Sequence, residues 1–456
     1  MLFLTLTLAA AAVDPSILAQ AQKLRDLALE DRTAYTMLES LTTEIGPRLA
    51  GTEAERRARG WSEKYLRRLG FKRVSVEPFD LETWVRGEET AEILAPYPQP
   101  LVVTALGRSG SARNLSGEVV YFSSFQALEE AESLQGKIAF IDHGMGKTQD
   151  GSSYSYFGKA RFNGPSVAAA KGAKAVMIRS VGTHSHRIPH TGATSWKEGQ
   201  SRVPAVAVSP PDADQIKRIV DSGKPLRVRM TVTPRVLGIQ KSGNVVAELR
   251  GNRRPGEIII AGGHLDSWDL GTGAVDDGAG VVITTAALHL IRKSGLKPAR
   301  TIRVVHWGAE EVGLVGAKAY AKAHVGENFI LGSESDFGAE RIFRIDSNVS
   351  SEGQAVVDEM VRLLAPLGVA QGRKGSDYGG SSGPDLSPLN ATGLPRFRLA
   401  QDGTDYFDLH HTPDDTFDKV KPDALAQNVA AYAVFLWIAA NVDTDFRKPA
   451  VANSGE

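Results

Sequence analysis

The sequence predicts an α/β fold, in which a mostly parallel, mixed central sheet is flanked by helices and carries a smaller inserted β-rich α/β domain. The first observation is a regular alternation of strand and helix patterns across residues 244–440. The second is a change in composition near Leu101, after which short apolar strands are separated by loops rich in Gly, Ser and Tyr. Such alternation is typical of parallel sheets covered by helices on both faces.

The N-terminal half begins with helical patterns. Leu18, Ala21 and Leu24 recur near helical spacing, Thr52 opens a second amphipathic stretch, and residues 74–79 then alternate like a strand. The region after Leu101 is predicted to hold four short strands and one helix. The strands are at 117–122, 136–142, 175–179 and 203–208, and the helix is around 165–171.

The second half supplies most of the predicted sheet. Strands are expected at 244–250, 257–262, 301–307, 329–333 and 396–400, with helices at 278–293, 313–323, 355–367 and 422–440. The run at 258–261 is continuously apolar, which is typical of a strand buried on both faces. In open sheets of this kind, ligands bind beyond the carboxyl ends of the strands.

These patterns divide the 456 residues into two domains. We predict a signal peptide at residues 1–13, a main domain at 14–101 and 235–445, an inserted domain at 102–234 and a tail at 446–456. The first twelve residues, MLFLTLTLAAAA, suit a signal peptide and are shorter than the ~20 residues of a membrane span, although they lack basic residues. A secreted or periplasmic protein is therefore expected; the alternative is a frayed apolar terminus.

Composition excludes several classes of site and partner. Lys+Arg and Asp+Glu each number 53, so no excess charge indicates nucleic acid or an anionic membrane as a partner. There is no cysteine, which excludes disulfides, thiolate catalysis and cysteine-based metal sites. Any metal must be held by His, Asp and Glu.

Acidic and imidazole groups recur after the predicted strands. They are His264 and Asp266 in GGHLDSW, Asp276 in GAVDDGAG, Glu310 and Glu311 in WGAEEVGLVGA, Asp336 in ESDFG, and His410 and His411 in DLHHTPDDT. Taken singly, each has an ordinary explanation as a structural histidine, a helix cap or a solvated acidic pair. Together, at the ends of strands of one sheet, they predict a shared metal-binding pocket.

These motifs, with LTTEIGPRLAGT at residues 41–52, resemble those of the co-catalytic zinc exopeptidases of the M28 type, most closely the carboxypeptidase Q-like branch. The resemblance covers most of the chain, and the inserted region resembles a protease-associated domain. It implies two Zn²⁺ ions, because a carboxylate can bind two cations whereas an imidazole nitrogen binds one. The implied ligands are His264 and Asp336 for one ion, Glu311 and His411 for the other, and Asp276 as the bridge.

The resemblance also implies roles for four further residues. Glu310 is the expected general base, because the reaction requires a carboxylate near the attacking water that is not bound to metal. Asp266 lies two residues beyond His264 and is expected to orient that imidazole. His410 is interpreted as a donor to the developing oxyanion, with loop packing as the alternative. Asp385, in the loop GGSSGPDLSPL, is expected to meet the substrate's amino group, with a capped turn as an equal alternative.

The expected activity is hydrolysis of dipeptides or short peptides with free termini. The alternatives are aminopeptidase action on longer peptides, acyl transfer as in single-zinc glutaminyl cyclases, and an inactive receptor-like binding protein. The filled ligand positions and the presence of Glu310 favour hydrolysis. His184, His186 and His190 are interpreted as loop histidines. Relatives often form homodimers, for which this chain gives no independent sign.

Overall fold

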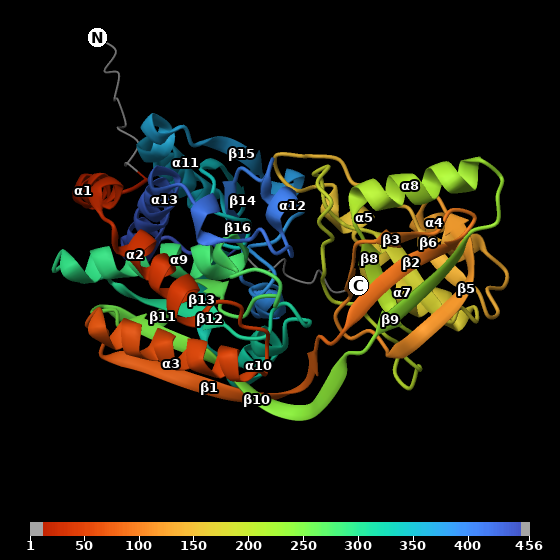
Figure 1. Cartoon of the computed structure of the whole chain (residues 1–456). Helices are drawn as coiled ribbons and strands as arrows, with labels where there is room; N and C mark the ends of the chain where they lie inside the picture. The colour runs from red at the N-terminus through yellow and green to blue at the C-terminus, as the bar shows by residue number, and fades with distance from the viewer. Residues whose placement is uncertain (1–11, 448–456) are drawn as a thin grey trace, which may run out of the picture.

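The computed structural model describes residues 12–447 and contains two bodies, each built around its own sheet (Figure 1). We call the larger one the main body and the smaller one the inserted body. The predicted signal peptide and tail lie outside the described residues, except for residues 12–13 and 446–447. Of these exceptions, Val13 and Phe446 are buried in the core of the main body.

A five-stranded mixed sheet organises the main body, with the order β1–β10–β12–β11–β13. Strand β11 pairs in parallel with β12 and β13, whereas β10 runs antiparallel to both β1 and β12. The strands are β1 (Arg73–Val85), β10 (Arg235–Leu249), β11 (Arg254–His264), β12 (Arg300–Trp307) and β13 (Asn328–Glu334). The parallel strands β12, β11 and β13 therefore end at the same edge of the sheet.

A second sheet of three strands packs beside the first, with β16 next to β13. Its central strand β14 is parallel to β15 and antiparallel to β16. The strands are β14 (Ile342–Asn348), β15 (Ala370–Lys374) and β16 (Arg396–Gln401). The mixed sheets flanked by helices confirm the predicted α/β class.

Helices cover both faces of the five-stranded sheet. The side chains of Ile259 and Ala261 pack in the cluster that includes α9 and α13, whereas Ile258 and Ile260 pack on the opposite face with Tyr320 of α10. This alternation accounts for the continuous apolar run in β11, because both faces of the strand are buried. The helices of the main body are α1 (Pro15–Glu30), α2 (Thr33–Ser40), η1 (Leu41–Ile45), α3 (Glu53–Arg68), η2 (Ala274–Gly278), α9 (Ala279–Lys293), α10 (Val315–Ala323), α11 (Ser351–Leu364), η3 (Ala365–Leu367), η4 (Gly375–Asp377), η5 (Ser387–Thr392), α12 (Tyr406–Leu409), η6 (Phe417–Lys419) and α13 (Pro422–Asn441).

Two of these helices are long and apolar enough, by length and composition, to resemble membrane spans. They are the segments Ala274–Lys293 and Pro422–Asn441, and 94% of the most apolar window of each is buried inside the protein. Their apolar character is therefore used in the core of the main body, where α9 and α13 pack against each other and against the sheet.

The inserted body contains an eight-stranded sheet, ordered β3–β2–β9–β5–β6–β7–β8–β4, with a parallel centre from β5 to β8. The strands are β2 (Glu89–Ala95), β3 (Gln99–Leu101), β4 (Val103–Ala105), β5 (Ala112–Phe122), β6 (Ile138–Ile141), β7 (Ala175–Arg179), β8 (Ala205–Val208) and β9 (Arg227–Val232). The helices are α4 (Phe125–Glu130), α5 (Tyr154–Phe157), α6 (Lys159–Phe162), α7 (Gly164–Ala170) and α8 (Pro210–Asp221). The connections to the main body run through β1 and β10 (Figure 1).

The start of the inserted body differs from the predicted boundary at residue 102. Strands β2 and β3, which the prediction assigned to the main domain, belong to the inserted sheet because β2 pairs with β9. Ile93 of β2 lies opposite Val228 of β9, a pairing between residues far apart in sequence that local patterns do not reveal. The sheet ends at Val232, next to the predicted boundary at 234.

Candidate metal centre

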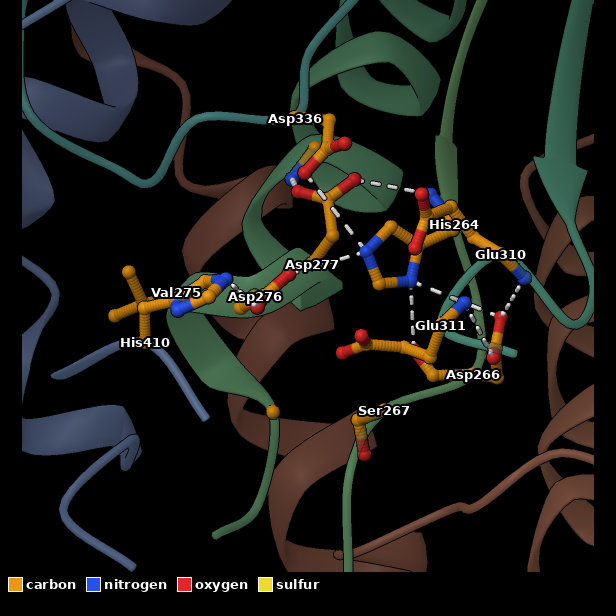
Figure 2. A network of polar contacts seen from close by, with 12 residues as sticks. His264, Asp266, Ser267, Val275, Asp276, Asp277, Glu310, Glu311, Asp336 and His410 are labelled. Atoms are coloured by element: carbon orange, nitrogen blue, oxygen red, sulfur yellow. Dashed lines mark hydrogen bonds and ion pairs between the residues drawn. The ribbon is translucent and has the colours of Figure 1, made fainter. Parts of the chain in front are cut away.

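The ends of three parallel strands bring acidic and imidazole groups to one place. Strand β11 ends at His264, β12 is followed by Glu310 and Glu311, and β13 is followed by Asp336. Asp276 reaches the same place from η2, at the start of α9. Figure 2 shows the carboxylates of Asp266, Asp276, Asp277 and Asp336 gathered around the ring of His264.

The two nitrogens of His264 have separate partners. Nε2 lies 3.1 Å from Oδ1 of Asp276 and 3.8 Å from Oδ1 of Asp336. Nδ1 lies 2.9 Å from the backbone carbonyl of Asp266, which can accept its proton. With the proton on Nδ1, the lone pair of Nε2 points toward the two carboxylates and is free to bind a metal ion between them.

His411 has the same arrangement on the other side of Asp276. Its Nε2 lies 3.2 Å from Oδ2 of Asp276 and 3.0 Å from Oε2 of Glu311. Its Nδ1 lies 3.2 Å from the carbonyl of Thr191 in the inserted body and 3.3 Å from the guanidinium of Arg161. Asp276 therefore has one oxygen facing each imidazole, which is the geometry that a bridging carboxylate needs.

The donor set fits bound cations. The ligand atoms of His264, Asp276 and Glu311 lie within 4.8 Å of one another, and all three residues are buried. Oδ2 of Asp276 and Oε1 of Glu311 are buried without a hydrogen-bond partner. Buried carboxylates so close together repel one another, so a site of this kind calls for a compensating positive charge. Nitrogen and oxygen donors suit Zn²⁺, among other divalent metals.

The pKa values of the cluster reflect this crowding. Burial alone would raise the pKa of Asp276, but its hydrogen bond with His264 and the close imidazole of His411 hold it well below its ordinary value. Burial, opposed by His264 and assisted by the charge of Asp276, raises the pKa of Asp336 to about 6. Burial also raises the pKa of Glu310 well above its ordinary value, with repulsion from Asp336 adding to the effect.

The adjacent glutamates have different surroundings. Glu311 contacts His411 and accepts a hydrogen bond of 2.6 Å from the indole of Trp268, whereas Glu310 lies on the wall of the central cavity. The backbone amides of both donate to the carboxylate of Asp266, at 3.0 and 3.3 Å. Asp266 therefore contacts His264 mainly through its backbone carbonyl and positions the glutamate pair through its side chain.

Asp277 has a structural task that distinguishes it from Asp276. Its carboxylate accepts hydrogen bonds from the backbone amides of His264, at 2.9 Å, and Gly280, at 3.0 Å. The second bond caps the first turn of α9. Both oxygens of Asp277 are thus occupied by backbone donors.

His410 is stacked on His411, with ring centroids 3.5 Å apart, and lies on the cavity wall. Its Nε2 is 3.8 Å from Asp276, farther than that of His411, and its Nδ1 is buried without a partner. Burial and the neighbouring His411 lower the pKa of His410 well below its ordinary value, so it is neutral. His411 itself has a left-handed backbone with φ 63°, a conformation that is uncommon outside glycine and is concentrated at functional sites.

Two supporting residues were missed by the sequence interpretation. Arg48, which is fully buried, donates to the carbonyls of Thr272 and Gly273 at 2.6 and 2.8 Å and so fixes the loop before Asp276. Asp415 accepts hydrogen bonds from the amides of Val275 and Asp276. The sequence feature that could have indicated these two residues is their position inside the motifs LTTEIGPRLAGT and DLHHTPDDT.

Asp385 and the loop histidines contact residues beside the site. Asp385 is fully buried, its amide donates to Glu334 at 2.8 Å, and the neighbouring Pro384 is the residue that lines the cavity. His190 contacts His184, with 2.8 Å between their Nε2 atoms, and its Nδ1 lies 2.6 Å from the carbonyl of His410. Among the described residues, the groups able to share a metal do not include these loop histidines.

A cavity of about 510 Å³ opens beside the cluster, and both bodies form its walls. The inserted body contributes Arg108, Tyr154, Arg161, Phe162 and the segment 193–195, opposite the acidic and imidazole groups of the main body. A volume of this size suits a small ligand. The fold and site together thus define an α/β enzyme with a candidate metal centre at the carboxyl edge of its sheet.

Comparisons with known proteins identify the family. The model of peptidase family M28 matches residues 244–436. Carboxypeptidase Q of Bos taurus is 32% identical over 415 residues, which cover 90% of this chain and 86% of that protein. Aminopeptidase YwaD of Bacillus subtilis is 25% identical over 93% of this chain and 88% of that protein. The chain belongs to peptidase family M28, and the predicted resemblance is confirmed.

Solved structures agree with this assignment. The crystal structure of a peptidase M28 precursor from Shewanella amazonensis is 45% identical and has a TM-score of 0.91, with 95% of this chain and 98% of that chain covered. A zinc aminopeptidase from Bacillus subtilis shares the fold, with a TM-score of 0.63 and 20% identity over 91% of this chain and 98% of that chain.

Proposed function

We propose that this peptidase uses two zinc ions to hydrolyse dipeptides or short peptides with free termini. The observation that carries the proposal is the position of Asp276, whose two oxygens face the Nε2 atoms of His264 and His411 at 3.1 and 3.2 Å. One ion would be held by His264 and Asp336, the other by Glu311 and His411, and both by Asp276. A zinc aminopeptidase among the proteins with this fold supports the choice of metal.

Each residue of the site has a task in this proposal. When bound, the zinc ions would polarise the scissile carbonyl and lower the pKa of the attacking water. Glu310, which lies on the cavity wall, accepts a proton from that water and returns it to the leaving amine as the C–N bond breaks. Asp266 keeps Glu310 in place through the backbone hydrogen bond of 3.0 Å. His410, neutral and beside the cavity, is proposed as a donor to the developing oxyanion.

The enclosing walls favour short substrates. The inserted body faces the cluster across a cavity of about 510 Å³, which limits the length of chain that fits. Carboxypeptidase Q and an aminopeptidase are both among the relatives, so an aminopeptidase acting on longer peptides is the second candidate. Acyl transfer with a single zinc is less favoured, because the donor atoms suit two ions.

The test combines metal analysis with a substrate panel. The protein is treated with a chelator, reconstituted with zinc, and assayed against a free dipeptide, its N-acetyl form, its C-terminal amide and a longer peptide. We expect two zinc ions per chain and zinc-dependent cleavage that requires a free amino group and favours a free C-terminal carboxylate over its amide. Cleavage of long peptides as fast as dipeptides would favour the aminopeptidase. Two bound zinc ions with no cleavage of any peptide would overturn the hydrolase proposal.

A further inference from the structure

Arg108, on the cavity wall, is distinguished by a guanidinium that has no hydrogen-bond or ion-pair partner within residues 12–447. It belongs to the inserted body, is half-buried, and forms no ion pair or hydrogen bond with another described side chain. Its charged neighbours are Arg202 and Glu82, which pair with each other at 2.6 Å. A partly desolvated arginine normally finds an anionic or carbonyl partner, because its five N–H donors otherwise lose hydrogen bonds to water.

The backbone that presents Arg108 is strained and firmly held. Its φ is 66°, a left-handed conformation that is unfavourable for a residue with a side chain and is concentrated at ligand-binding sites. The preceding Gly107 donates to the carbonyl of Gly192 at 2.9 Å and accepts from the amide of Thr194 at 3.1 Å. A Cβ at Gly107 would lie 2.1 Å from Cη2 of Trp268, so the loop packs directly on the main body.

The two bodies contribute different charges to the cavity wall. The acidic residues, including Asp276, Glu310 and Asp336, belong to the main body, whereas Arg108 and Arg161 belong to the inserted body. The main body also contributes one cation, Lys318, whose ammonium donates to the carbonyl of Gly313 at 2.8 Å. Arg161 is fully buried, and its terminal nitrogens contact Tyr154 and His411, which leaves its Nε without a partner. Arg108 is the inserted-body cation on this wall whose whole guanidinium forms no hydrogen bond or ion pair among the described residues.

We propose that Arg108 binds the C-terminal carboxylate of the peptide substrate. The inference rests on the proposed function, in which the scissile bond lies at the metal centre. A guanidinium can donate two parallel hydrogen bonds to a carboxylate, a geometry that an amide or an extended peptide chain does not match. The inserted body thereby selects substrates whose free carboxylate reaches Arg108, and it acts as a determinant of specificity rather than only as a wall.

The experiment compares a free dipeptide with its C-terminal amide in the zinc-reconstituted full chain. The variant Arg108→Asn removes the charge with a residue that tolerates the left-handed backbone, and Arg108→Lys keeps the charge without the paired donors. Arg202→Gln is the matched control, because this neighbouring arginine pairs with Glu82 and does not line the cavity. An uncleavable analogue with a reduced peptide bond, in acid and amide forms, gives binding constants by calorimetry.

We expect wild type to prefer the acid over the amide by about 10- to 100-fold in kcat/KM and in binding. Arg108→Asn should abolish this preference by raising KM for the acid, while kcat and the kinetics of the amide change little. Arg108→Lys should retain part of the preference for the acid. Arg202→Gln should retain the full preference. Equal losses for acid and amide in Arg108→Asn, or an unchanged preference, would overturn the assignment.

Binding of the uncleavable analogues distinguishes a failure of this inference from a failure of the proposed reaction. A preference for the acid analogue that Arg108→Asn abolishes would support the carboxylate site even if wild type cleaved neither peptide, a result that would overturn only the hydrolysis. Conversely, zinc-dependent cleavage of acid and amide at equal rates would support the peptidase and overturn the role of Arg108.

Discussion

The backbone carbonyl of Thr191, in the inserted body, lies 3.2 Å from Nδ1 of His411, in the main body. In the tautomer that leaves Nε2 free for metal, Nδ1 donates to this carbonyl and the ring orientation is fixed. The amide of Thr191 in turn donates to the carbonyl of His411 at 3.0 Å. The inserted body is thus bonded directly to a proposed metal ligand, in addition to forming a wall of the cavity.

This relationship predicts that a change in the inserted loop weakens zinc binding. Gly192 has φ 137°, and a Cβ there would lie 2.5 Å from the guanidinium of Arg161, so Gly192→Ala must displace either the loop that holds the Thr191 carbonyl or the guanidinium that contacts His411. Loss of such a partner typically costs 10- to 100-fold in metal affinity, and we expect about 10-fold. Competition with a fluorescent zinc chelator measures it.

The matched control for that experiment is Gly199→Ala, in the same body. Gly199 also has a left-handed backbone, with φ 72°, but its added Cβ would meet no atom within 4 Å. Zinc affinity should be unchanged in this variant, although backbone strain lowers stability slightly. Equal zinc affinity in both variants and wild type would contradict the coupling between the inserted loop and His411.

Variants of the two adjacent glutamates should affect catalysis and metal binding separately. Glu310→Gln is expected to lower kcat by about 10²- to 10⁴-fold while two zinc ions remain bound, because only the proton acceptor is lost. Glu311→Gln should instead lower the zinc content, since Glu311 faces His411 at 3.0 Å. Metal analysis and steady-state kinetics of the same preparations test both. If Glu310→Gln lost zinc and Glu311→Gln kept it, the assignment would have to be reversed.

Local sequence patterns were sufficient where the relevant structure is local. Residues 175–179 were predicted as a strand and form β7. His264, Glu311 and Asp336 lie at or just after strand ends as expected, whereas Asp276 lies in η2 and His411 follows α12. Contacts between distant segments were not foreseeable. Because β2 pairs with β9, the inserted body begins earlier in the chain than predicted. The partner of His411 is a backbone carbonyl, which any residue type supplies. The contacts of Asp415 were missed because its partners are backbone amides, which almost any residue type supplies.

Arg48 should be essential for the loop that precedes Asp276. The variant Arg48→Met leaves the carbonyls of Thr272 and Gly273 buried without their donors and removes a cation near Asp415. We expect a loss of about 3–5 kcal/mol in the free energy of unfolding, together with weaker zinc binding. Urea unfolding measures the first effect. Arg57→Met, at an exposed position of α3, is the control and should change stability by less than about 0.5 kcal/mol.

A pH-dependent contribution to stability is expected from His324, far from the metal centre. Its Nε2 lies 3.0 Å from Glu77 and its Nδ1 3.1 Å from Glu327, which also pairs with Arg303. The hydrogen bond to Glu77 and the charges of both carboxylates raise the pKa of His324 above its ordinary value, against the effect of burial. Because the folded-state pKa is raised, this stabilisation is complete below about pH 6.5, the unfolded value, and is lost as the pH rises through the folded-state pKa.

The variant His324→Phe tests this contribution while retaining an aromatic ring to stack on Tyr320, whose centroid lies 4.0 Å away. Urea unfolding should show a loss of about 1 kcal/mol relative to wild type at pH 5.5 and a smaller loss at pH 9, because the charge of His324 is lost as the pH rises through its raised folded-state pKa. Glu77→Gln should remove much of the same pH-dependent component, so the double variant should lose less than the sum of the two. Equal destabilisation by His324→Phe at both pH values would mean that packing of the ring, rather than its charge, stabilises this end of α10.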